Sequence, residues 1–227
     1  MRTLPLVFVA NHMFVDLPEG RWLIYTGSPS TFGAPGFITW DGVRRTVPQR
    51  LGPVGMPEIQ RHVATPFVGL IGGDLLNAQA SCWDGPRGEF RLHDTNVGEG
   101  AVEIDYEDLL GAPIVRARLG RHDARCILDT GAQFGYILTE RFAEGGTDDG
   151  RIEDFNPLLG AINCRAWLIE ANMNGVQFTE RVGHLSGLAG ITLGAFGIDA
   201  ILGCSWLPPR CVWYQPQRKR LAIAPIA

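Results

Sequence analysis

The chain has 227 residues, which is enough for one large domain or for two small lobes with a substantial buried core. Its 29 glycines and 15 prolines predict short strands joined by many turns. A net charge of −4 without a basic stripe argues against a nucleic-acid partner. No apolar run approaches the about 20 residues that a membrane-spanning helix needs, so we also expect no membrane partner.

Short apolar or alternating runs mark the expected strands, which in chain order are 4–9, 21–25, 37–40, 114–119, 125–129 and 221–226. The first run is broken by Pro5 and followed at once by Asn11 and His12, which favours a first strand over a signal peptide. Helical signals are confined to a short turn at 138–142. The predicted fold class is therefore all-β.

Two further signals lie later in the chain. Residues 144–150 are rich in glycine and acidic side chains, which predicts a polar loop. Asn174-Gly175 separates two apolar runs. This pair predicts a hairpin, because both central residues of such a turn need a positive φ.

Two similar turn sequences lie about a hundred residues apart. The first is Leu23-Ile24-Tyr25-Thr26-Gly27-Ser28, and the second is Ile127-Leu128-Asp129-Thr130-Gly131-Ala132. In each, two apolar strand residues precede a polar side chain and a Thr-Gly turn. The two turns differ in chemistry at this polar position, because the second has the carboxylate of Asp129 where the first has the phenol of Tyr25.

Two more elements repeat in the same order, which indicates an internal duplication. Leu70-Ile71-Gly72 corresponds to Ile201-Leu202-Gly203, and a terminal strand-turn-strand at 83–92 corresponds to 213–222. Phe90 follows Gly72 at the same spacing as Leu221 follows Gly203. We therefore predict an N-terminal lobe over 1–94 and a C-terminal lobe over 101–227, joined by a polar linker.

The five cysteines show no CxxC pattern and no zinc-like spacing with histidine. We expect buried, reduced thiols and hence a reducing compartment, the cytoplasm. The five histidines are scattered without pairing. No metal and no cofactor is expected.

The two turns and the apolar-apolar-glycine elements resemble the aspartic peptidases of the retropepsin and pepsin type. The resemblance covers essentially the whole chain, and it is specific in the second lobe and partial in the first. It implies two retropepsin-like β-barrel lobes related by pseudo-twofold symmetry, as in the bilobal pepsins. Carried over by position, Asp129 is one catalytic aspartate, Thr26 and Thr130 brace the two loops, and Gly27 and Gly131 allow the tight turns.

Tyr25 departs from that family, in which each lobe supplies one aspartate. The chemistry of the pair needs two carboxyl groups that share one proton. A phenol with a pKa near ~10 is a donor and no base at neutral pH. We expect a single ionised Asp129 that accepts a hydrogen bond from Tyr25, with the ring obstructing the position of the water.

Three functions follow from this pattern. The first is a pseudoprotease or very weak peptidase that keeps a cleft for a peptide or protein ligand. The second is an active aspartic endopeptidase that uses Asp129, either by pairing the C-terminal lobes of two chains or with an acid from elsewhere in the chain. The third is a non-catalytic interaction module. The internal duplication favours a monomer over a homodimer, because one chain already carries both turns.

Overall fold

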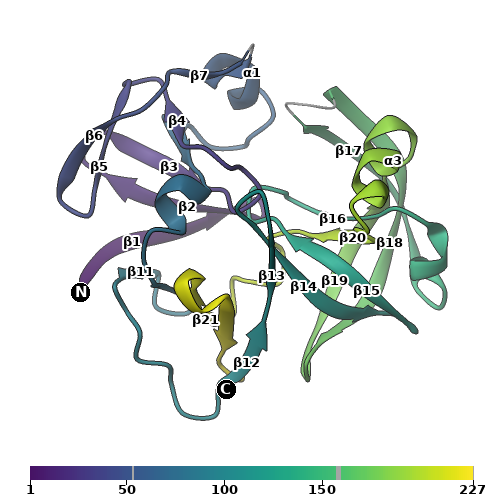
Figure 1. Ribbon diagram of the computed structural model, residues 1–227. Helices are drawn as coiled ribbons and strands as arrows, with labels where there is room; N and C mark the ends of the chain where they lie inside the picture. Colours follow the sequence, from purple (N-terminus) through teal and green to yellow (C-terminus); the bar gives the residue numbers. More distant parts are fainter. Residues whose placement is uncertain (53, 157–159, 227) are drawn as a thin grey trace.

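The computed structural model describes residues 1–52, 54–156 and 160–226. The protein is built mostly from strands and has two lobes with two large sheets (Figure 1). We call residues 1–94 lobe one and residues 101–227 lobe two.

Lobe one contains β1 (Arg2–Val9), β2 (His12–Leu17), β3 (Gly20–Ile24), β4 (Phe32–Gly33), β5 (Phe37–Trp40), β6 (Val43–Thr46), β7 (Arg50–Leu51), β8 (Val54–Gly55), α1 (Met56–Gln60), β9 (Gly69–Ile71), α2 (Gly73–Leu76), β10 (Ser81–Asp84) and β11 (Glu89–Leu92).

Lobe two contains β12 (Val102–Asp105), β13 (Glu107–Leu109), β14 (Ala112–Leu119), β15 (His122–Leu128), β16 (Gly135–Ile137), the 3₁₀ turn η1 (Glu140–Ala143), β17 (Thr147–Asn156), β18 (Gly160–Met173), β19 (Val176–His184), α3 (Gly187–Ala195), β20 (Ala200–Leu202), β21 (Cys211–Gln215), the 3₁₀ turn η2 (Pro216–Arg218) and β22 (Arg220–Ile223).

One sheet is shared by the two lobes. Its ten strands run in the order β12-β22-β21-β10-β11-β1-β2-β3-β9-β4. The lobes meet where β10 pairs antiparallel with β21. The second sheet belongs to lobe two and runs β13-β14-β15-β20-β16-β19-β18-β17. The largest apolar core spans both lobes and contains Trp83 and Phe90 from lobe one and Leu128, Trp206 and Tyr214 from lobe two.

The predicted strands are confirmed, with ends shifted by one to three residues, and 37–40 is matched in full. The hairpin at Asn174-Gly175 joins β18 to β19, and Asn174 has the positive φ that the turn needs. Both terminal strand-turn-strand elements are antiparallel hairpins.

Two expectations are wrong. The predicted polar loop at 144–150 ends early, since β17 already begins at Thr147, and Asp148 there forms an ion pair with Arg165 on β18. Helical segments are not confined to the expected turn, where η1 lies, because the short helices α1 and α2 and the longer α3 lie elsewhere in the chain. Helix α3 is rich in glycine and buries no residue, so it carries no amphipathic pattern. No helix in the described part of the chain is long and apolar enough to cross a membrane.

Candidate functional site

Each of the two turns follows a strand held in a parallel pair. In lobe one β3 pairs with β9, and in lobe two β15 pairs with β20. The pairing continues into the turns, where the Tyr25 N–H donates to the carbonyl of Ile71 at 2.9 Å and the Asp129 N–H donates to that of Leu202 at 2.9 Å. Tyr25 and Asp129 therefore occupy equivalent backbone positions in the two lobes.

The threonines of the two turns brace the loops against each other. The Thr26 hydroxyl donates to the carbonyl of Leu128 at 2.6 Å, and the Thr130 hydroxyl donates to that of Ile24 at 2.7 Å. Each hydroxyl also accepts the other's backbone N–H, at 3.1 Å for Thr26 N and 3.0 Å for Thr130 N. Both threonines are buried, so these four bonds fix one loop on the other across more than 100 residues of sequence.

Glycines in the apolar elements allow a close chain crossing beneath each turn. A Cβ added at Gly72 would lie 2.6 Å from backbone atoms of Ser30, and one added at Gly203 would lie 2.6 Å from the backbone of Phe134. Because backbone atoms cannot give way as a side-chain end can, only glycine fits at these two positions.

The side chains at the two equivalent positions cross over, each onto the other turn. A Cβ added at Gly131 would lie 2.3 Å from the Tyr25 ring. A Cβ added at Gly27 would lie 2.5 Å from the Asp129 carboxyl group. The phenol ring thus covers Gly131 in the way that the carboxyl group covers Gly27.

The expected hydrogen bond from Tyr25 to Asp129 is not among the contacts of the described residues. Asp129 Oδ1 instead accepts the Gly131 N–H at 2.9 Å. The expected ionised form of Asp129 prevails only above neutral pH. Burial raises the pKa of Asp129 to about 7, although hydrogen bonds from Gly131, Ala132 and Gly27 oppose the shift. Asp129 is only 8% exposed, so desolvation outweighs these donors.

The phenol is tied to its neutral form. The negative charge of Asp129 and, next, burial raise the pKa of Tyr25 well above its ordinary value. Tyr25 therefore offers a proton donor at most, and no base, beside Asp129.

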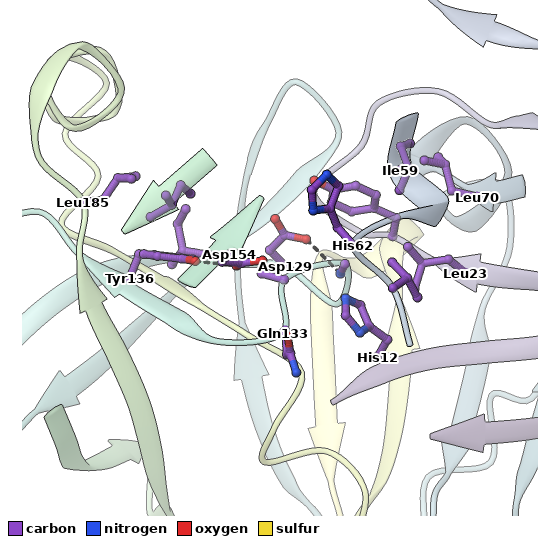
Figure 2. A pocket seen from close by; sticks show the side chains of 16 residues that line it. His12, Leu23, Ile59, His62, Leu70, Asp129, Gln133, Tyr136, Asp154 and Leu185 are labelled. Atoms are coloured by element: carbon purple, nitrogen blue, oxygen red, sulfur yellow. Dashed lines mark hydrogen bonds between the residues drawn. The ribbon is translucent and has the colours of Figure 1, made fainter. Parts of the chain in front are cut away.

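A cavity of about 60 Å³ opens in front of the two turns, between the lobes. Lobe one contributes apolar walls and two histidines, His12 and His62, and lobe two contributes Asp129, Tyr136 and Asp154 (Figure 2). This volume admits a few water molecules or the end of one side chain. A group that enters the cavity comes next to Asp129, among several apolar side chains.

Asp154 is the residue that sequence reasoning missed. It lies on β17, and its carboxylate accepts a hydrogen bond from the Tyr136 hydroxyl of β16. Figure 2 shows Asp154 and Asp129 on the same side of the cavity. The negative charge of Asp154 adds to the factors that raise the pKa of Asp129. No local motif marks Asp154, because it reaches the cavity only through the pairing of β17 with β18.

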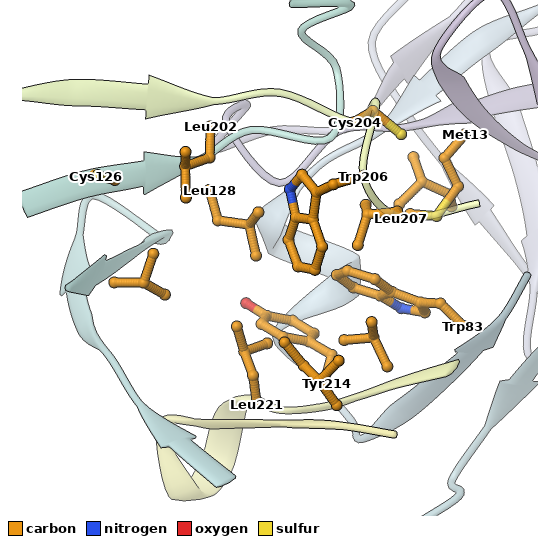
Figure 3. Close-up of a cluster of buried hydrophobic side chains, with 14 of the residues drawn as sticks. Met13, Trp83, Cys126, Leu128, Leu202, Cys204, Trp206, Leu207, Tyr214 and Leu221 are labelled. Carbon is orange, nitrogen blue, oxygen red and sulfur yellow. The ribbon is translucent and has the colours of Figure 1, made fainter. Parts of the chain in front are cut away.

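The base of the lobe-two turn is supported by apolar packing and by a buried acid. Leu128 and Leu202 pack with Trp206 in the core below the loops (Figure 3). Beside them Glu180 is fully buried and accepts the Ser205 hydroxyl at 2.8 Å. Burial raises the pKa of Glu180 to about 7. This carboxyl group does not line the cavity and has a structural role.

Within the described ranges, no group of three or more His, Cys, Asp or Glu side chains is arranged to hold a metal ion. The polar side chains that line the cavity are His12, Tyr25, His62, Asp129, Gln133, Tyr136 and Asp154.

No protein-family model matches the sequence, and no curated protein matches it either. The structure is similar to the crystal structure of an aspartic proteinase from Irpex lacteus, with a TM-score of 0.58 and 14% sequence identity. The match covers 100% of this chain and 97% of that one. Similarity at this identity concerns the fold alone. The chain has the all-β, bilobal fold of pepsin-like aspartic proteinases.

Proposed function

We propose that this protein binds a peptide segment between its lobes and does not cleave it by the two-aspartate chemistry of aspartic peptidases. The observation that carries the proposal is the Tyr25 ring lying over Gly131, where the second carboxyl group would have to be. The rest of the loop architecture, including the Thr26–Thr130 bracing, is retained.

The missing carboxyl group removes one half of the reaction. Peptide hydrolysis by such a pair needs a base that activates water and a protonated acid that polarises the scissile carbonyl. Asp129 supplies one of these roles. Tyr25 is held neutral, so it offers only a weak donor, and its ring occupies space next to Asp129. General acid–base assistance of this kind is typically worth about 10²–10⁴-fold in rate.

The cavity walls support binding by a peptide. Leu23, Ile59 and Leu70 of lobe one face Ile162 and Leu185 of lobe two across the cavity. Apolar walls around a few polar groups are typical of ligand sites. A side chain of the ligand would enter the cavity while the peptide backbone runs along the opening between the lobes.

The test combines binding and cleavage on one peptide library. The purified protein selects binders from a random library, and mass spectrometry of the same mixtures reports cleavage. We expect bound, intact peptides. Ile162→Glu places a charge in the wall and should abolish binding, whereas Leu110→Glu at a 79% exposed site away from the cavity should not. Absence of any selected peptide would contradict the binding proposal, and robust cleavage that Asp129→Ala abolishes would contradict the inactive site.

Asp154 favours a second candidate, a slow hydrolase in which this residue replaces the absent carboxyl group. It enters the same cavity as Asp129 from a different strand. In that case Asp129 and Asp154 together hold the water and the shared proton. Asp154→Asn and Asp129→Asn should then each remove the cleavage activity of the unmodified chain, while the unmodified chain and Tyr25→Phe should cleave equally.

Pairing of the second lobes of two chains is not needed in either case. The Asp129 loop already holds the Tyr25 loop through four buried hydrogen bonds, which an Asp129–Asp129 site would have to break. This supports a site completed within one chain, and the mass of the protein in solution tests it.

A further inference from the structure

Two thiols from different lobes meet at the junction of the shared sheet. The sulfur atoms of Cys82 and Cys211 lie 3.2 Å apart, although 129 residues separate them in sequence. Cys82 lies on β10 and Cys211 on β21, the two strands through which the lobes pair. In the register, Asp84 lies opposite Cys211, so the two cysteines are diagonal neighbours on one face of the sheet.

The distance is that of a contact between two thiols, and both are free. A disulfide has an S–S bond of about 2.05 Å, so the two atoms need to approach by roughly 1 Å. Because the two cysteines are diagonal neighbours, rotation of the side chains combined with a small shift of the two strands would supply this movement. Within the described residues, this is the one pair of cysteines whose sulfur atoms are in contact, which sets the two apart from Cys126, Cys164 and Cys204.

A partly buried cation accompanies the pair. Arg91, directly opposite Cys82 on β11, donates from Nη2 to the Cys82 sulfur at 3.0 Å. Arg91 is also held by Asp84, Glu89 and Asp94, at 2.8 to 2.9 Å, so its position is fixed. The guanidinium charge favours the thiolate form of both cysteines, but at Cys82 the contact with Cys211 and burial outweigh it and raise the pKa, so only Cys211 gains thiolate character.

The two thiols differ in access. Cys82 is fully buried, whereas Cys211 is half-buried and can be reached from solvent. The hydrogen bond from Cys82 lowers the pKa of Cys211, while burial and Asp84 oppose this shift. Cys211 is therefore the thiol that an oxidant reaches first. Cys82 is in contact with the Cys211 sulfur and can react with the oxidised form of Cys211.

We propose that Cys82 and Cys211 form an oxidative modification site, at which a hydroperoxide converts the two thiols into a disulfide that joins the lobes. The Cys211 thiolate attacks one oxygen of hydrogen peroxide, the O–O bond breaks, and a sulfenic acid forms while the released hydroxide takes up the proton that the Cys211 thiol lost, giving water. The Cys82 sulfur then attacks the Cys211 sulfur, the S–O bond breaks, and the leaving hydroxide takes up the Cys82 proton as a second water. In sum, two thiols and one hydrogen peroxide give one disulfide and two waters.

The bond would fasten β10 to β21 and so restrain the two lobes. It would close a loop that contains the Asp129 turn and most of lobe two. Cross-linking a loop of this length reduces the entropy of the unfolded chain. This loss lowers the equilibrium constant of unfolding by up to about 10³-fold. Since some strain offsets this gain, we expect the unfolding constant of the oxidised protein to fall by about tenfold or more.

The experiment uses the reduced, full-length protein and hydrogen peroxide. After treatment, remaining thiols are alkylated under denaturing conditions, and the digest is analysed by mass spectrometry with and without dithiothreitol. We expect one cross-linked peptide pair, Cys82–Cys211, which the reductant removes. Cys82→Ser should instead accumulate a dimedone-reactive sulfenic acid at Cys211. The matched control Cys164→Ser, at a half-exposed thiol of lobe two, should retain the cross-link.

Several outcomes would overturn the proposal. Recovery of Cys82 and Cys211 as alkylated thiols after peroxide treatment would do so without any variant. Faster oxidation of Cys164 than of Cys211 would contradict the assignment of the reactive thiol. An unfolding constant that is the same before and after cross-linking would contradict the restraint on the lobes.

Discussion

Replacing Asp129 by Asn removes a carboxyl group without changing the shape of the side chain. Asn Oδ1 can still accept the Gly131 N–H, so the turn keeps its hydrogen bond. The change isolates the cost of placing a charge in this buried position. We therefore expect Asp129→Asn to keep the fold and to alter how stability depends on pH.

The magnitude follows from the raised pKa. The pKa of Asp129 goes from 3.8 to about 7 on folding. The folded protein thus holds this proton more tightly than the unfolded chain, and the free energy of unfolding falls as pH rises from about 4 to about 7. At 1.36 kcal/mol for each pKa unit, the ionised Asp129 costs about 4 kcal/mol at most above pH 7. Asp129→Asn should equal the unmodified protein at pH 4 and exceed it by about 2–4 kcal/mol at pH 8.

Urea unfolding followed by tryptophan fluorescence at pH 4, 6 and 8 measures this difference. Glu180 also has a raised pKa, but it is present in both proteins and cancels in the comparison. Asp123→Asn, at a side chain 85% exposed, is the matched control and should change stability by less than about 0.5 kcal/mol. A loss of more than about 3 kcal/mol in Asp129→Asn at pH 8 would refute the reasoning and point to a buried ion pair.

Three further changes test the supports of the site by the same unfolding assay. Thr130→Val leaves the Ile24 carbonyl and the Thr26 N–H buried without partners, so it should lower the free energy of unfolding by about 2–5 kcal/mol. The exposed control Thr46→Val should lower it by less than about 0.5 kcal/mol. A loss below about 1 kcal/mol at Thr130 would contradict the bracing role. Gly131→Ala places a methyl group against the Tyr25 ring and should lower the free energy of unfolding by about 1–3 kcal/mol. In the control Gly194→Ala the methyl group meets nothing within 4 Å, so the free energy of unfolding should not fall. Equal losses in the two variants would contradict the packing of the Tyr25 ring on Gly131. Burial raises the pKa of Glu180 to about 7, so Glu180→Gln should raise the free energy of unfolding above pH 7 and leave it unchanged near pH 4. A change that is independent of pH would show that it does not come from the ionisation of Glu180.

Short stretches of sequence were enough to locate the two turns, and the family resemblance that they carry supplied the role of their threonines. That resemblance implied that Thr26 and Thr130 brace the two loops, and the hydrogen bonds have that pattern. Gly72 and Gly203 were singled out by their place after two apolar residues, and each lies against a crossing backbone.

The features that were missed depend on contacts between distant segments. Asp154 enters the cavity because β17 pairs with the long strand β18, and no pattern around residue 154 reveals this. The meeting of Cys82 with Cys211 depends on the pairing of β10 with β21 between the lobes. The raised pKa of Asp129 could not be predicted either, because burial sets it and sequence does not state how far a loop is covered.

The central proposal is that the identity of residue 25 decides whether the site between the two lobes can cleave peptides. Its most direct test is the rate of peptide-library cleavage by Tyr25→Asp, compared with the unmodified chain and with Tyr25→Asn, which makes the same space without a carboxyl group. We expect cleavage by Tyr25→Asp alone, and its loss when Asp129→Ala is added. Cleavage by the unmodified chain at the same rate, or a folded Tyr25→Asp protein that cleaves nothing, would contradict the account.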